Sequence, residues 1–184
     1  MSKRAAVIYY PGRVDRKKLA AAIDLTIGSN EWEPTLWLPT TAAEPGGEQA
    51  LRAIAQKATH LLVVGGDGTA RQVFEAVTLA GLADKVTVGL IPVGTGNVLA
   101  RHLKIELNDL RTTVKRALTG NRHAIDLGLA RIIFEDGSRA EKIFSVMGGI
   151  GLDAKIMQKT DPKLKRAIGW VAYIDGGIKA LPTL

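Results

Sequence analysis

Two glycine-rich segments carry the residues best suited to chemistry in this chain of 184 residues. The first consists of Gly65, Gly66, Asp67, Gly68 and Thr69, and the second of Gly94, Thr95, Gly96 and Asn97. Glycines at a strand end allow backbone N–H groups to converge on a phosphate, and a helix that begins at Thr69 adds its positive end. Two such segments after neighbouring strands favour a phosphate-binding site over ordinary tight turns.

Asp67 is the acidic residue of the first segment. A carboxylate beside phosphates is repelled unless it faces Mg²⁺ or accepts the proton of an attacking hydroxyl, and phosphoryl transfer requires both tasks. The alternative is a structural turn in which Asp67 or Thr69 caps the following helix. In the second segment, Thr95 and Asn97 offer neutral hydrogen bonds to phosphate or ribose oxygens.

Other catalytic and nucleotide-binding motifs are absent from the sequence. There is no P-loop, and Arg71 and Leu99 occupy the positions where the G-x-G-x-x-G fingerprint needs its third glycine. The protein-kinase motifs, G-x-S-x-G and H-E-x-x-H are also missing. The absence of cysteine excludes disulfides, thiolate zinc sites and a cysteine nucleophile, and three scattered histidines argue against a histidine metal cluster.

Strands and helices alternate around these segments. We predict strands over residues 5–10, 33–38, 60–64 and 85–91, and helices over 16–27, 48–58, 70–80, 98–103 and 109–118. This order predicts an α/β fold with an N-terminal parallel sheet flanked by helices on both faces. Ligands bind such sheets at the carboxyl ends of the strands, which is where both glycine segments lie.

The pattern changes near residue 120. Alternation over residues 124–133, a turn signal at Glu135, Asp136 and Gly137, and a strand over 142–147 predict an antiparallel hairpin. A glycine-rich turn over 148–151 and a helix starting within 153–157 follow. We therefore expect a nucleotide-binding α/β domain over residues 1–120 and an incomplete β-rich second domain over 121–184, since a β domain needs more strands to bury a face.

The charge balance favours an anionic partner, because the formal net charge is +7. Five basic residues crowd residues 155–166 and are opposed only by Asp161: Lys155, Lys159, Lys163, Lys165 and Arg166. This stretch suits peripheral contact with an anionic membrane, although a charge run of this kind is more often a solvated helix face. Nucleic acid is not expected, because no motif of that class is present and aromatic residues make up only 5%.

No apolar run reaches the roughly 18 residues needed to span a bilayer, and the short run after the first residues is not a signal peptide. We therefore expect a cytoplasmic protein, with the inner face of the membrane as a peripheral location. A homodimer is compatible with the sequence, which does not determine the oligomeric state.

Residues 63–69 (VVGGDGT) together with 91–97 (IPVGTGN) resemble the diacylglycerol kinase catalytic-domain family, which includes bacterial lipid kinases and the sphingosine and ceramide kinases. The GGDGT block is shared with NAD kinases, and the P-x-GTGN block one strand later makes the resemblance specific. Residues 125–128, 144–153 and 169–181 resemble segments of that family's second domain. The resemblance thus spans nearly the whole chain.

The resemblance implies ATP-dependent transfer of the γ-phosphate, with Mg²⁺, to a lipid hydroxyl such as that of diacylglycerol. The implied nucleotide-binding residues are Pro11, Thr41, Gly65, Gly66, Asp67, Gly68, Thr69, Gly94, Thr95, Gly96 and Asn97. Thr40 is an alternative register for Thr41. Asp67 and Asp126 are the implied metal residues, although Asp126 equally fits a strand-end turn or an N–H cap.

The sequence departs from the family in two ways. The family has Asn-Pro after its first strand, whereas this chain has Tyr10 before Pro11. Family members are also longer, and the late aspartate expected as catalytic base in bacterial enzymes has no counterpart here, which leaves Asp67 as the candidate base. The chain alone is then expected to understate the parent's activity. The alternatives are a nucleotide-binding protein without turnover and an NAD-kinase-like activity, and the Asn-Glu pair of NAD kinases is absent.

Overall fold

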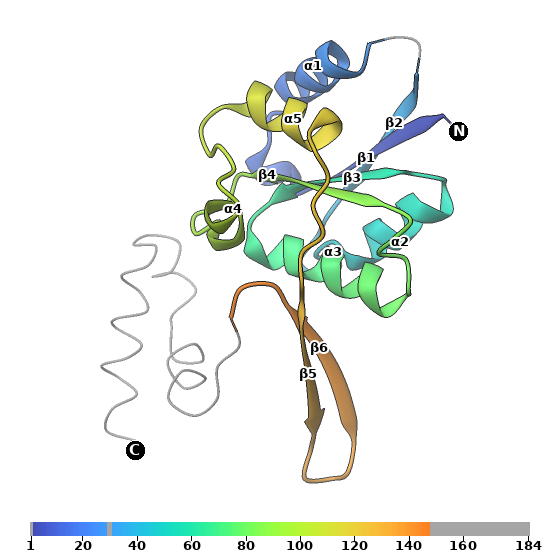
Figure 1. Cartoon of the computed structure of the whole chain (residues 1–184), viewed down its shortest axis with the longest axis vertical. Coiled ribbons are helices and arrows are strands. Elements are labelled where there is room, and N and C mark those ends of the chain that lie inside the picture. The colour runs from blue at the N-terminus through green and yellow to red at the C-terminus, as the bar shows by residue number, and fades with distance from the viewer. Residues whose placement is uncertain (1, 29–30, 148–184) are drawn as a thin grey trace. The chain divides into compact units, whose positions relative to one another are not determined.

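Four strands form a parallel sheet in a computed structural model that describes residues 2–28 and 31–147 (Figure 1). In chain order they are β1 (Lys3–Tyr9), β2 (Trp32–Pro39), β3 (His60–Gly65) and β4 (Thr87–Pro92). Their order across the sheet is β2-β1-β3-β4, and every pairing is parallel. The predicted parallel sheet is confirmed.

Helices cover both faces of this sheet (Figure 1). They are α1 (Arg16–Ile27), α2 (Gly47–Ala55), α3 (Asp67–Leu79), α4 (Val98–His102) and α5 (Leu110–Thr119), with a 3-10 turn η1 at Pro11–Arg13. Successive side chains of β1 alternate between two apolar clusters: Val7 packs with residues of α1 and α5, and Ile8 packs with residues of α2 and α3. A strand buried on both faces must be apolar throughout, which explains the unbroken apolar run in β1.

Two helix boundaries differ by three residues from the sequence-based expectation, and the others agree within one residue. Helix α2 ends at Ala55, three residues early, because Lys57 adopts a left-handed conformation with φ of 64°. Helix α3 begins at Asp67, so the first glycine segment already contains a helical turn. Asp67 therefore stands in the first turn of α3 and does not cap it; the N-cap is Gly66, with no side-chain hydrogen bond.

The strand order creates a switch point between β1 and β3. The chain passes from β1 through α1 to β2 on one side, and then returns to place β3 on the other side of β1. Tyr9 of β1 is level with Val64 of β3 and with Pro39 of β2. The residues that follow these three strands consequently lie side by side at the edge where open α/β sheets bind ligands.

The predicted hairpin is present, with corrected bounds. It consists of β5 (Gly128–Ile133) and β6 (Arg139–Phe144), paired antiparallel. The prediction of strands over 124–133 and 142–147 was wrong at their edges because the tight turn sets the register. Phe134 and Ser138 close that turn by a 2.9 Å backbone hydrogen bond, so pairing resumes at Arg139 and ends where Gly128 meets Phe144.

The hairpin contacts α3 through Glu75, whose side chain is mostly buried. Its carboxylate accepts a hydrogen bond from the Ile143 N–H at 3.2 Å and pairs with Lys142 at 3.3 Å and Arg71 at 2.6 Å. Residues 1–145 cluster as one unit that includes the hairpin. A domain boundary at residue 120 stays a prediction.

Several predicted features lie outside the described residues. They are the glycine turn at 148–151, the helix starting within 153–157, the basic stretch 155–166, most of segment 144–153 and the whole of segment 169–181. Within residues 2–28 and 31–147, no helix combines the length and apolar character needed to cross a membrane.

Candidate functional site

The two glycine segments pack against each other, backbone to backbone. A Cβ added at Gly94 would lie 2.7 Å from the Cα of Gly66 and 2.9 Å from the Asn97 Oδ1. Real Cβ atoms essentially never approach so closely. The turns after β3 and β4 therefore need glycine at position 94 to meet at the carboxyl edge of the sheet.

Asp67 links the first turn to the second. Its Oδ2 accepts a hydrogen bond from the Val98 N–H and its Oδ1 accepts one from the Leu99 N–H, both at 3.1 Å. The carboxylate thus satisfies the first free N–H groups of α4, where a negative charge is also favoured by the helix dipole. The alternative in which Asp67 or Thr69 caps the following helix α3 is wrong; Asp67 instead binds the first N–H groups of α4.

Asn97 shapes the second turn. It adopts a left-handed conformation with φ of 49°, and its Nδ2 donates a hydrogen bond to the Gly94 carbonyl at 2.6 Å. Asparagine tolerates this conformation better than most residues. The side chain is 6% exposed, and its Oδ1 is buried without a hydrogen-bond partner. Asn97 therefore presents an unpaired acceptor beside Gly66 and Gly94.

The glycines of the first turn differ in their surroundings. A Cβ at Gly65 would lie 2.9 Å from the Cβ of Thr69, so the Thr69 side chain already occupies the space beside Gly65. A Cβ at Gly68 would meet nothing within 4 Å, and no positive φ demands glycine there. Gly68 is consequently the position in this turn where the backbone lies open to a ligand.

A hollow lies between the two turns. It is lined by Val63, Gly65, Gly66, Asp67, Ala70, Leu90, Ile91, Pro92, Asn97, Leu99 and Ala100. The lining thus combines residues of both glycine segments with the apolar ends of β3 and β4. Among the predicted site residues, Thr95 is exposed and Gly96 packs with its Cβ position 3.2 Å from the Asp67 Oδ2.

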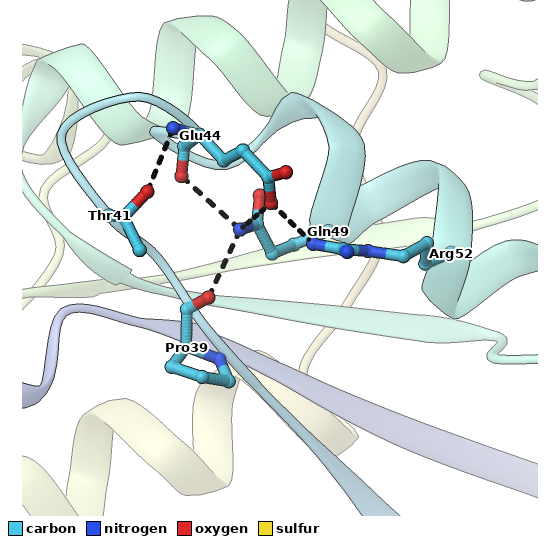
Figure 2. A network of polar contacts seen from close by, with 5 residues as sticks. All are labelled: Pro39, Thr41, Glu44, Gln49 and Arg52. Carbon is cyan, nitrogen blue, oxygen red and sulfur yellow. Dashed lines mark hydrogen bonds and ion pairs between the residues drawn. The ribbon is translucent and has the colours of Figure 1, made fainter.

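The loop after β2 carries Thr41 and is held by the network in Figure 2. Gln49 of α2 is 1% exposed. Its Nε2 donates to the Pro39 carbonyl at 3.0 Å, the Glu44 carbonyl at 3.2 Å and the Glu44 carboxylate at 3.3 Å. Arg52 also binds that carboxylate, at 2.8 Å. One buried amide thereby joins both ends of the loop.

Thr41 faces this loop and solvent. Its Oγ1 accepts a hydrogen bond from the Glu44 N–H at 3.0 Å, and the side chain is exposed. The hydroxyl hydrogen is free to be donated, since a hydroxyl both donates and accepts. Thr40, the alternative register, is 5% exposed, so Thr41 is the threonine that a ligand can reach.

Thr69 connects the Thr41 loop with the first glycine turn. Its side chain packs against Gly65 on one side, and a Cβ at Gly46 would lie 3.1 Å from its Cγ2. Gly46 has a φ of 141°, which side chains rarely adopt. The loops after β2 and β3 are therefore packed together through one small side chain.

Pro11, Asp126 and the other acidic groups are placed differently. Pro11 is the first residue of η1, directly after β1, and is exposed. Asp126 is exposed in the segment before β5 and does not line the hollow that contains Asp67. Among the described residues, no group of three or more acidic, histidine or cysteine side chains could hold a metal.

Sequence reasoning missed Arg101, an exposed cation on α4. Its Nε donates a hydrogen bond to the Gly96 carbonyl at 3.0 Å, which fixes the guanidinium beside the second turn. A signal was available, because a basic residue four positions after Asn97 lies one helical turn away on the same face. The remaining N–H groups of Arg101 can contact an anion at this edge.

An ionisable group affected by burial lies at the opposite edge of the sheet. His60 begins β3, where its ring lies 4.8 Å from that of Trp32. Burial, reinforced by the charges of Lys3 and Arg122, lowers the pKa of His60. The amino edge is therefore built for packing, while the open glycine position lies at the carboxyl edge.

Comparisons with known proteins agree with this architecture. The family model described as "Diacylglycerol kinase catalytic domain" matches residues 11–130. A diacylglycerol kinase of Bacillus subtilis is 31% identical over 184 residues, covering 99% of this chain and 57% of the relative. A YegS-like protein of Klebsiella pneumoniae, named as a probable lipid kinase, is 34% identical over 65% of this chain and 37% of its own length.

A solved structure shares the fold. The crystal structure of a Bacillus anthracis protein assigned as a diacylglycerol kinase superposes with a TM-score of 0.66 at 21% identity, covering 99% of this chain and 55% of that one. The chain thus spans little more than half the length of the Bacillus relatives that it matches along its whole length.

Proposed function

Because this chain belongs to the diacylglycerol kinase catalytic domain family, we propose that its full gene product transfers the γ-phosphate of ATP to a lipid hydroxyl, with diacylglycerol as the first candidate. The relatives named for diacylglycerol or lipid phosphorylation motivate the acceptor class. Residues 1–120 would bind the nucleotide, and the chain from residue 121 onward would begin the lipid-binding domain. An acceptor held in a bilayer makes contact with an anionic membrane a natural part of this proposal.

The observation that carries the proposal is the open backbone at Gly68 beside two interlocked turns. Helix α3, with 13 residues, directs its positive end toward this position. Phosphate oxygens bind best where N–H groups and a helix N-terminus converge without an obstructing side chain. The Thr41 hydroxyl, the Arg101 guanidinium and the N–H groups around Gly68 supply donors for a triphosphate.

Asp67 fits the acidic role in this proposal. Each carboxylate oxygen accepts one N–H and retains capacity for a second contact, since an ionised carboxylate has about four acceptor positions. Mg²⁺ is commonly held by one or two carboxylates plus substrate phosphates, and one fixed carboxylate beside a phosphate cradle suits that pattern. When bound, Mg²⁺ would neutralise charge that develops on the transferring phosphate. The two N–H bonds keep Asp67 oriented without a rearrangement.

The proton of the acceptor hydroxyl needs a base. Among the residues that the structure describes, Asp67 is the acidic residue that lines the hollow between the glycine turns. We therefore assign the role of base to Asp67. Asp126 would join only through solvent-mediated contacts, because its exposed side chain does not line the hollow that contains Asp67.

A second candidate is a nucleotide-binding protein without turnover. The observation that favours it is the double hydrogen bonding of Asp67 to α4, which gives this residue a structural task independent of catalysis. An assay of the full gene product with ATP, Mg²⁺ and a panel of lipid alcohols separates the candidates. Phosphorylation of any lipid establishes the kinase; ATP binding by calorimetry without phosphorylation supports the second candidate.

A further inference from the structure

Tyr10 stands at the switch point of the sheet. It follows β1 directly, one residue beyond Tyr9, which is level with Val64 of β3 and Pro39 of β2. Tyr10 therefore leaves the sheet where the chain reaches Gly65 after Val64 on one side and Thr40 after Pro39 on the other. The next residues along these neighbours, Gly66 and Thr41, belong to the proposed nucleotide site.

The Tyr10 side chain is unusually open for an aromatic residue. It is 50% exposed, and only Phe134 in the hairpin turn, at 49%, is a comparably exposed aromatic among the described residues. A phenol ring left half in water gives up burial that would favour folding. The chain therefore keeps an apolar, planar surface uncovered at the edge where a ligand is expected.

Gly12 lies close to this ring. A Cβ at Gly12 would lie 2.8 Å from the Tyr10 Cε1, 3.2 Å from its Cζ and 3.3 Å from its hydroxyl oxygen. The hydroxyl end of the ring thus lies close to Gly12 of η1, a turn that the Arg13 N–H closes by a 3.1 Å bond to the Tyr10 carbonyl. Gly12 therefore covers part of the ring near its hydroxyl end, while half of the Tyr10 surface stays exposed.

We propose that Tyr10 is a nucleotide-binding residue whose half-exposed ring stacks on the nucleobase of the phosphate donor. A rigid, half-exposed aromatic ring suits stacking, because every base presents a π-face and little side-chain freedom is lost on binding. The position of Tyr10 directly after β1, next to the turns after β2 and β3, would let one nucleotide reach both the ring and the phosphate cradle. This inference rests on the proposed nucleotide function and adds the part of the nucleotide that Tyr10 contacts.

Calorimetry of the full gene product, with ATP and with inorganic tripolyphosphate as probes in the presence of Mg²⁺, tests this assignment. Tyr10→Ala removes the ring, Tyr10→Phe keeps the ring without the hydroxyl, and Phe134→Ala removes an equally exposed aromatic elsewhere. Gly12→Ala is a second route, because its methyl group must displace the ring. Circular dichroism confirms that each variant is folded.

The expected result is a loss of about tenfold in ATP affinity for Tyr10→Ala, in the range that base–aromatic stacking supports, with tripolyphosphate affinity unchanged. Tyr10→Phe and Phe134→Ala should bind ATP as the unmodified protein does. Gly12→Ala should lower the affinity for ATP but not for tripolyphosphate. Unchanged ATP binding by Tyr10→Ala overturns the stacking role. Equal losses for ATP and tripolyphosphate, or a loss in Tyr10→Phe, would assign the hydroxyl to a phosphate and overturn it too.

The same titrations separate this inference from the function on which it rests. An unmodified protein that binds neither probe refutes the nucleotide site and Tyr10's role together. An unmodified protein that binds both probes, with Tyr10→Ala unaffected, refutes only the stacking role and leaves the nucleotide site standing.

Discussion

The two glycine turns are alike in sequence and differ in what surrounds their glycines. In the turn after β4, Gly94 meets Gly66 and Asn97, and Gly96 meets the Asp67 carboxylate. In the turn after β3, Gly65 is also filled by packing, but Gly68 faces open space. Glycine thus serves close backbone packing at one set of positions and leaves room for a ligand at another.

This difference assigns separate tasks to the two turns. The turn after β4 is scaffolding: it holds α4 in place, and α4 in turn holds Asp67 through two N–H groups. In the proposed function, the turn after β3 presents its open backbone to phosphate. A motif match treats both turns as ligand contacts. The packing instead predicts that substitution of Gly68 should spare the fold, whereas substitution of Gly94 should not.

Substitution of Asp67 should have the largest effect on turnover. Asp67→Asn keeps one oxygen acceptor for α4 but removes the charge needed to face Mg²⁺ or to accept a proton, so turnover should fall by at least about a hundredfold. The free energy of unfolding should fall by only about 1 kcal/mol, as for a weakened cap. Turnover and urea unfolding of the same preparation measure the two effects.

Asp109→Asn provides the matched control for Asp67. Asp109 also caps a helix, accepting the Thr112 N–H at 3.0 Å, but it stands at the start of α5. It should lose a similar amount of stability while keeping its turnover. Near-normal turnover in Asp67→Asn would show that Asp67 only caps α4 and takes no part in the mechanism.

Gly94→Ala should have the largest effect on stability. The added methyl group would press on the backbone of Gly66, which cannot move aside as a flexible side chain can. Overpacking of this kind costs about 1–3 kcal/mol, and we expect the upper part of that range. Urea unfolding checks the value; a variant as stable as the parent would show that the turns are not interlocked.

Gln49→Leu should have an intermediate effect on both stability and binding. Loss of the buried amide leaves the Pro39 and Glu44 carbonyls without their donor, which costs about 2 kcal/mol. The freed loop should also weaken ATP binding several-fold by releasing Thr41. Gln56→Ala, an exposed change just after α2, is the control and should alter neither quantity. Unchanged ATP affinity in Gln49→Leu would show that the Thr41 loop does not contribute to ATP binding.

Much of this fold could be predicted from sequence because its signals are local. The apolar runs of β1, β3 and β4 and the helical spacing between them determine the parallel sheet. The edges of β5 and β6 could not be predicted, because the turn at Phe134 and Ser138 sets the register and apolar alternation alone does not.

The sequence could name members of the candidate site, but it could not give their contacts. The glycine segments pointed to Asp67, Gly68 and Thr69, but nothing local indicates that Asp67 caps a helix that begins 31 residues later in the chain. The buried Gln49 network and the guanidinium of Arg101 likewise depend on tertiary neighbours. Sequence spacing reports which residues share an edge, and packing decides which atoms remain free.

The most direct test of the account is ATP titration of Gly68→Ala alongside its unfolding curve. A methyl group at Gly68 meets no protein atom, and alanine favours the helix, so stability should be unchanged or raised by up to about 1 kcal/mol. ATP affinity should nevertheless fall by about tenfold, because the methyl group occupies the space reserved for phosphate. A Gly68→Ala protein that binds ATP as tightly as its parent would contradict the claim that this turn holds the nucleotide.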